Sequence, residues 1–222
     1  VTGGFAEISA AGTTLLAEEA LHVSEVTPAI VKGFVARAEE ELRAAKEGGE
    51  AGARPVDKWN PPYCGSIGMS IRRDGVWLYQ GSPIGRIALV KLFASILRKD
   101  DDGKTYLVTP AEKIDVDVED APFLAVELAV SGEGRDQALT FRTNVDDVVT
   151  VDAAHPLRFQ VSEPDSGLKP YVLVRGRLEA LCTRAVYMEL VSLAEPNDED
   201  GEAVGVWSGG VWWRPAGPPG SS

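Results

Sequence analysis

The sequence predicts an α+β protein made of two related small domains, each with an antiparallel sheet and one helix. Segments in which apolar and polar residues alternate, as in half-buried strands, recur from residue 67 to residue 174. Apolar stretches with helical spacing interrupt them at residues 87–97 and near 183–193. In addition, one order of elements occurs twice, which favours a duplication.

The first of these domains is expected over residues 55–120. Ile67, Met69 and Ile71 alternate with small or polar residues, and Asp74-Gly75 then predicts a hairpin turn into a strand at 76–80. We expect Ser82-Pro83 to cap a wide-faced, mostly buried helix over residues 87–97. An Asp-Gly turn at 100–103 ends that helix, and strands follow at 106–109 and 113–120.

The second domain, residues 121–214, is expected to be mostly β with a C-terminal helix. Five strands are predicted, at 123–130, 138–143, 147–151, 157–161 and 170–174. The helix begins at Leu178 or at Thr183 and runs to Leu193, and the tryptophans near residue 210 predict a closing strand.

Both ends of the chain have a different character. Residues 1–54 are expected to form a mobile arm in which an amphipathic helix (28–46) precedes a Gly-rich linker. That helix would dock on the domain, on a second subunit or on a partner protein. Residues 215–222 are predicted to be a disordered tail.

The repeated order is strand, glycine, arginine-headed helix and Asp-Gly turn. In the first copy the arginine is Arg86 and the turn ends at Gly103; in the second they are Arg184 and Gly201. The arginine and the second glycine are the same distance apart in both copies. Glycine and aspartate are common turn residues, however, so chance agreement is the competing interpretation.

Composition limits the function. A chain of 222 residues with 44% hydrophobic content can bury a sizeable core, and its net charge of −12 without a basic stretch argues against a nucleic-acid partner. Cys64 and Cys182 lack a CxxC spacing, which suits a reducing cytoplasm. No apolar run of membrane-spanning length and no secretory signal is present in the sequence given, so we expect a cytoplasmic protein without a membrane partner.

The candidate binding residues gather at the predicted helix starts. An arginine in the first turn of a helix faces the positive end of the helix dipole, so an anion should compensate for it. Ser82, Gly85 and Arg86 form a predicted seat for a phosphate or carboxylate, and Arg184 would add a cation from the second copy. Arg72 and Arg175 lie near the same strands in sequence. The competing interpretation pairs Arg86 with Asp120 or Glu112 of its own domain.

The aromatic residues and the potential catalytic residues give weaker indications of a binding or catalytic site. Trp77 and Tyr79 alternate with polar neighbours and would stack a base at a cleft wall, unless they are core residues. Cys64 lacks a suitable histidine partner, and Asp100–Asp102 do not have the spacing of a calcium loop. We therefore predict no catalytic residue, no metal and no cofactor.

Five motifs between residues 59 and 123 carry a family resemblance: Trp-Asn-Pro-Pro-Tyr-Cys-Gly at 59–65, Asp-Gly-Val-Trp-Leu-Tyr-Gln-Gly-Ser-Pro-Ile-Gly-Arg at 74–86, Leu-Val-Lys-Leu-Phe at 89–93, Leu-Val-Thr-Pro-Ala-Glu-Lys at 107–113 and Glu-Asp-Ala-Pro-Phe at 119–123. Over residues 55–213 the chain resembles the bacterial domain-of-unknown-function family 1285. The resemblance implies two related α+β halves, the second similar to a pleckstrin-homology-like fold, without a settled activity.

Together these observations predict a non-enzymatic module in signal transduction. It would bind a small anionic, nucleotide-like ligand at the junction of the two halves. One alternative is a protein-interaction domain that uses the 28–46 helix, also for self-association. Another is a phosphoester hydrolase built around Arg86 and nearby carboxylates.

Overall fold

A computed structural model describes residues 54–161, 167–196 and 204–215, together with Ala36. Nearly all of the expected arm (1–54), including the 28–46 helix apart from Ala36, lies outside these residues, and so does the expected tail from residue 216 on. The predicted second Asp-Gly turn at 200–201 also falls outside them.

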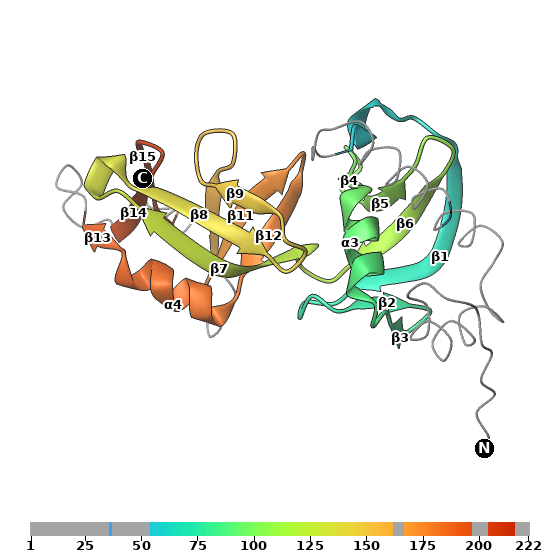
Figure 1. The fold of residues 1–222 in the computed structure, drawn as a ribbon, viewed down its shortest axis with the longest axis horizontal. Coiled ribbons are helices and arrows are strands. Elements are labelled where there is room, and N and C mark those ends of the chain that lie inside the picture. Colours follow the sequence, from blue (N-terminus) through green and yellow to red (C-terminus); the bar gives the residue numbers. More distant parts are fainter. Residues whose placement is uncertain (1–35, 37–53, 162–166, 197–203, 216–222) are drawn as a thin grey trace, which may run out of the picture.

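The first half is a six-stranded sheet with the order β3-β2-β1-β6-β5-β4, covered by the helix α3 (Figure 1). A short 3-10 helix, η1, precedes it. The bounds are η1 Val56–Lys58, β1 Tyr63–Ile71, β2 Trp77–Tyr79, β3 Ser82–Pro83, α3 Ile87–Ser95, β4 Leu97–Lys99, β5 Thr105–Val108 and β6 Lys113–Val118.

The second half contains another six-stranded sheet, with the order β10-β11-β12-β7-β8-β9, followed by α4 and a small three-stranded sheet, β13-β14-β15. Its bounds are β7 Phe123–Ser131, η2 Gly134–Asp136, β8 Ala138–Thr143, β9 Val148–Thr150, β10 Leu157–Val161, β11 Leu168–Arg175, β12 Leu178–Cys182, α4 Arg184–Ser192, β13 Glu195–Pro196, β14 Val204–Ser208 and β15 Val211–Trp213.

The two large sheets have the same topology, and this confirms the expected duplication of α+β halves. In each sheet, counted along the chain, the first three strands form one antiparallel group and the last three strands form another. The first and sixth strands then pair in parallel at the centre, β1 with β6 and β7 with β12. The sheets are therefore mixed, whereas the sequence predicted antiparallel ones. Parallel pairing joins segments far apart in the chain, which short-range patterns cannot show.

The two helices, by contrast, are not equivalent. The first helix, α3, connects the third and fourth strands of its sheet, whereas α4 follows the sixth strand of the other. The predicted repeat that aligned Arg86 with Arg184 is therefore wrong, although the duplication itself is present. Glycines and Asp-Gly turns occur wherever the chain reverses, so their spacing agreed by chance.

Ser82 and Pro83 do not cap a helix. They form β3, which returns antiparallel to β2 with Tyr79 opposite Ser82. Both residues of the connecting turn, Gln80 and Gly81, have positive φ, of 48° and 81°. This is the geometry of a tight two-residue hairpin. The helix begins only at Ile87, with Arg86 as its N-cap.

Three further elements refine the sequence prediction. Helix α3 ends at Ser95, and the predicted last helical residues instead open the strand β4. Of the two predicted starts for α4, the one at Thr183 is confirmed, because 178–182 form β12 and Thr183 is the N-cap. The tryptophan-rich strand is a hairpin, β14–β15, that turns at Gly209-Gly210 with positive φ at both.

One hydrophobic core runs through both halves. Buried residues of the first sheet, such as Ile71 and Ile114, belong to the same cluster as Phe123 and Phe141 of the second. The hairpin turn at Gly75 packs against the second half so closely that an added Cβ would lie 2.9 Å from side-chain atoms of Leu124 and Asn144. The junction is thus a packed interface. The strands-then-helix order of the second half agrees with the pleckstrin-homology-like expectation, which stays a prediction.

Candidate anion site at the junction of the two halves

Two predicted binding residues belong to the core instead. Trp77 and Tyr79 are 1% and 6% exposed, and the ring of Trp77 stacks on Phe93 with centroids 6.3 Å apart. Neither ring is available to stack on a ligand. On β2 the two aromatics lie two residues apart, on either side of the half-buried Leu78, so both point to the buried face of the strand.

The predicted seat at the start of α3 is open but isolated. Ser82, Gly85 and Arg86 are all exposed, and among the described residues Arg86 forms no ion pair. The same holds for exposed Arg184 at the start of α4, which lies on the other half, away from α3 (Figure 1). Arg86 and Arg184 therefore do not converge on one ligand.

Asp120, one of the two carboxylates expected to compete for Arg86, is engaged by other residues. Asp120 accepts hydrogen bonds from Lys169 Nζ at 3.0 Å and Tyr171 Oη at 2.7 Å, and Arg73 lies 3.3 Å from it. Burial alone would raise the pKa of Asp120, but these donors outweigh it and lower the pKa. Asp120 thus links the halves, and its engagement gives no support to a hydrolase built on it.

Of the predicted arginines, Arg175 is the one that reaches the junction. At the end of β11 it donates 2.5 Å to the carbonyl oxygen of Ala94 in α3, pairs with Asp147, and lies 5.0 Å from the ring centre of Phe123. Arg72 lies elsewhere, in an exposed pair with Asp74 at 2.7 Å. A cation from the second half is therefore anchored against the first.

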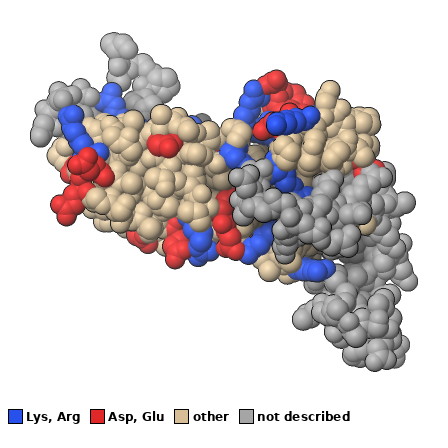
Figure 2. Space-filling model, turned by 45° about the horizontal axis from the view of Figure 1, so that its top comes forward, with Lys and Arg blue, Asp and Glu red and all other residues tan. Residues whose placement is uncertain are grey.

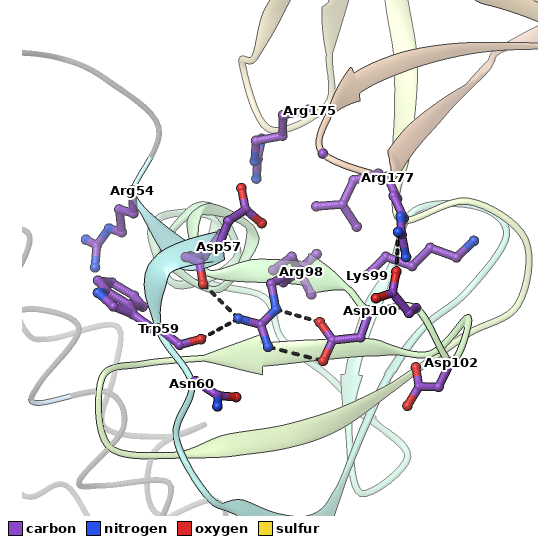
Figure 3. A pocket seen from close by; sticks show the side chains of 15 residues that line it. Arg54, Asp57, Trp59, Asn60, Arg98, Lys99, Asp100, Asp102, Arg175 and Arg177 are labelled. Carbon is purple, nitrogen blue, oxygen red and sulfur yellow. Dashed lines mark hydrogen bonds and ion pairs between the residues drawn. The ribbon is translucent and has the colours of Figure 1, made fainter.

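A hollow of about 720 Å³ lies beside Arg175, between the halves (Figure 3). The first half contributes η1, β4 and the β4–β5 turn, and the second half contributes the β11–β12 turn. Five cationic and four carboxylate side chains line it, in a chain with a net charge of −12. They are Arg54, Arg98, Lys99, Arg175, Arg177, Asp57, Asp100, Asp101 and Asp102.

Arg98 fixes the first-half wall. Its guanidinium donates to both carboxylate oxygens of Asp100, at 2.5 and 3.1 Å, and to the carbonyl oxygens of Val56 and Trp59, at 2.8 and 2.6 Å. The hydrogen bond from Arg98 lowers the pKa of Asp100, with a further contribution from Lys113. Because η1 is tied down in this way, the partly buried Trp59 is held at the edge of the hollow.

Two further cations that line the hollow, one from each half, are accessible. Lys99 is exposed, and among the described residues it pairs with no carboxylate. Arg177, in the β11–β12 turn, pairs with Asp101 of the β4–β5 turn. Their side chains are 57% and 90% exposed, so solvent screens this pair. Lys99 comes from one half and Arg177 from the other, so the two cations line one hollow only in the folded protein.

A second hollow, of about 410 Å³, adjoins the same two cations. Lys99 and Arg177 line both, while the second hollow adds Ser66, Lys104 and the carboxylates of Asp115 and Asp117 on β6. Lys99 and Arg177 therefore form the ridge that the two hollows share.

Sequence reasoning missed this pair. Arg177 follows Gly176, whose φ is +53°, in the turn between β11 and β12. A Val-Arg-Gly-Arg-Leu turn between apolar runs was a recognisable hairpin pattern, but the sequence offered a helix start at Leu178 as an alternative. Lys99 was not predicted because the expected helix extended to Leu97, so the strand β4 that carries Lys99 was not foreseen.

Charges of both signs alternate around the junction. In Figure 2, basic and acidic side chains lie next to each other where the halves meet, and much of the remaining face of the second half is uncharged. Within the described residues, no three His, Cys, Asp or Glu side chains are arranged to hold a metal ion. No helix in this part of the chain has the length and apolarity needed to cross a bilayer.

Two models of one protein family together match residues 54–214. The model of the DUF1285 N-terminal domain, a domain of unknown function, matches residues 54–121, and that of the DUF1285 C-terminal domain matches residues 122–214. A crystal structure of a DUF1285 family protein from Silicibacter pomeroyi DSS-3 is 44% identical, with a TM-score of 0.70, over 74% of this chain and 88% of that one.

Short matches to two curated proteins also occur. The ATP synthase epsilon chain of Jannaschia sp. (strain CCS1) is 48% identical over 48 residues, and that of Rhizobium meliloti (strain 1021) is 47% identical over 45 residues. These matches span 22% and 20% of this chain, and the chain spans only about a third, 36% and 34%, of the two relatives.

Proposed function

Because the chain belongs to the DUF1285 family, for which no activity is described, we propose a function from the junction itself: a non-enzymatic module that binds a small anionic, nucleotide-like ligand. The observation that carries the proposal is the roughly 720 Å³ hollow, which accessible cations of both halves, Lys99 and Arg177, line. Its volume is in the usual range for small-molecule sites.

The cations would hold the anionic group. Arginine offers a planar fork of donors that matches phosphate and carboxylate oxygens, and lysine adds a compact charge. Arg175 is anchored by Asp147 and the Ala94 carbonyl, so it contributes a fixed positive charge nearby.

Trp59 would hold the planar part of the ligand. It lines the hollow, and the hydrogen bond from Arg98 to its carbonyl oxygen fixes its backbone. Stacking of a base on an aromatic side chain typically contributes about 1 to 3 kcal/mol. The distribution of cations and one aromatic ring therefore favours a nucleotide over a simple inorganic anion.

Binding of sodium salts of ADP and pyrophosphate to the full chain, measured by isothermal titration calorimetry, tests the proposal. Both probes should bind, and ADP should bind more tightly because it adds the stacked base. The double variant Lys99→Gln/Arg177→Gln should weaken both probes, whereas Trp59→Leu should weaken ADP alone.

Arg184→Gln serves as the matched control, since it removes an exposed arginine that is remote from the hollow. It should leave both affinities unchanged. Failure of both probes to bind at millimolar concentration, or equal loss with Arg184→Gln, would contradict the proposal. Signal transduction in a cytoplasmic setting belongs to the same proposal, in which the ligand alters contacts of the module with other proteins.

A further inference from the structure

The ion pair between Arg177 and Asp101 bears on how the proposed ligand enters. Asp101 belongs to the β4–β5 turn of the first half and Arg177 to the β11–β12 turn of the second, so the pair crosses the junction. Both residues line the larger hollow, and Arg177 also lines the smaller one. The carboxylate of Asp101 thus occupies the guanidinium that an anionic ligand would need.

This contact is weakly held compared with the others at the junction. The side chain of Asp101 is 90% exposed, and an exposed pair of this kind contributes little because water and salt screen it. Asp100 and Asp102, its neighbours, are held by Arg98 and Tyr106 respectively, with Tyr106 Oη 2.6 Å from Asp102. The hydrogen bond from Tyr106 lowers the pKa of Asp102. Of the three consecutive carboxylates, Asp101 is the one that pairs with an exposed cation of the other half.

Other contacts keep the halves together when this pair opens. Arg175 reaches the Ala94 carbonyl, Lys91 of α3 pairs with Asp146 of the second half, and Asp120 binds Lys169 and Tyr171. Displacing the Asp101 side chain would therefore free Arg177 without separating the halves, while Arg98 and Tyr106 still hold the β4–β5 turn.

From these contacts we infer that Asp101 is an internal competitor for the anion site, which selects ligands carrying a doubly charged phosphoryl group over singly charged carboxylates. The inference rests on the proposed function. A phosphate monoester carries about −1.5 to −2 charges at pH 7 and offers three acceptor oxygens. With more charge and more acceptor oxygens than a single carboxylate, it can outcompete Asp101 for Arg177, whereas an added carboxylate gains nothing over Asp101.

The test compares pyrophosphate and acetate binding to the full chain by titration calorimetry at low ionic strength. Asp101→Asn should tighten pyrophosphate binding roughly two- to fivefold, the range expected when an exposed ion pair no longer competes. Acetate should show no binding to the natural protein. Arg177→Gln should weaken pyrophosphate roughly tenfold or more, because it removes a charge-assisted contact.

Asp74→Asn is the matched control, because Asp74 forms an exposed ion pair with Arg72 of the same kind but away from the hollows. Its change in total charge equals that of Asp101→Asn, so a general electrostatic effect would appear in both. The inference is overturned if the two variants tighten pyrophosphate equally, or if Asp101→Asn has no effect while Arg177→Gln weakens binding. In that second case the proposed function still stands. If pyrophosphate binds neither the natural protein nor Asp101→Asn, both fail.

Discussion

The two halves share a sheet topology but differ in where the helix is placed. In the first half α3 joins the third strand to the fourth, and its residues Lys91 and Ala94 contact the second half. In the second half α4 follows the last strand of the large sheet, and Val186 and Leu190 are its buried residues. A common sheet therefore tolerates a helix at either position, provided that an apolar face of the helix is covered.

The comparison also explains where the candidate site lies. Both turns that line the hollow from opposite sides connect neighbouring strands in the second meander of their sheets, β4–β5 and β11–β12. The first meets the second through Asp101 and Arg177. The site thus arises from the pairing of the halves rather than from the two helix starts.

The largest expected effect concerns the shared core. Trp77→Ala in the first half and Phe141→Ala in the second should each lower the free energy of unfolding by about 3 to 5 kcal/mol, because each leaves a cavity at a fully buried site. Since both side chains belong to one cluster, each substitution should shift the same single transition in chemical denaturation followed by circular dichroism. Two transitions, each sensitive to one substitution, would show that the halves unfold independently.

A smaller effect is expected at the link between the halves. Asp120→Asn should destabilise the protein by about 1 to 3 kcal/mol at neutral pH, because it weakens the hydrogen bonds from Tyr171 and Lys169 to a carboxylate that is 10% exposed. Asp117→Asn, on the exposed face of β6, is the control and should be close to neutral.

The pH dependence of this difference follows from the lowered pKa of Asp120. A carboxyl group with a depressed pKa in the folded state stabilises the protein above its unfolded pKa, about 3.9, and loses that contribution as the pH falls through the folded value. The difference in unfolding free energy between the natural protein and Asp120→Asn should therefore be largest near neutral pH and shrink in strong acid. A gap that grows on acidification would contradict the assignment.

The smallest effects distinguish the two helix starts. Thr183, the N-cap of α4, accepts a hydrogen bond from the backbone N–H of Val186, whereas Arg86, the N-cap of α3, provides no such bond. Thr183→Ala should therefore lower the free energy of unfolding by about 0.5 to 1 kcal/mol. Arg86→Asp should raise it by about 0.5 to 1 kcal/mol, because it adds a cap and removes a cation from the positive end of the helix dipole. Thermal unfolding measures both, and a destabilising Arg86→Asp would indicate a role for Arg86 beyond that of an uncapped helix start.

The sequence by itself determined most of the elements. Period-two alternation located β1, β6, β8 and β10, because a strand with one buried face requires it whatever it pairs with. The Asp74-Gly75 turn and the Thr183 start of α4 followed from local backbone chemistry in the same way. These features depend on residues that are neighbours in the chain.

Only the tertiary structure decided which elements pair, which side chains are buried and which residues line the hollow. The parallel pairings of β1 with β6 and of β7 with β12, the burial of Trp77, and the hollow that Lys99 and Arg177 both line depend on segments far apart in sequence. A short window of residues carries no information about contacts with distant segments. Alternating aromatics are compatible with a core or with a cleft. An arginine in a turn reveals neither its ion-pair partner nor a hollow beside it. The physical reason is that packing between halves, which fixes these contacts, depends on the whole folded chain.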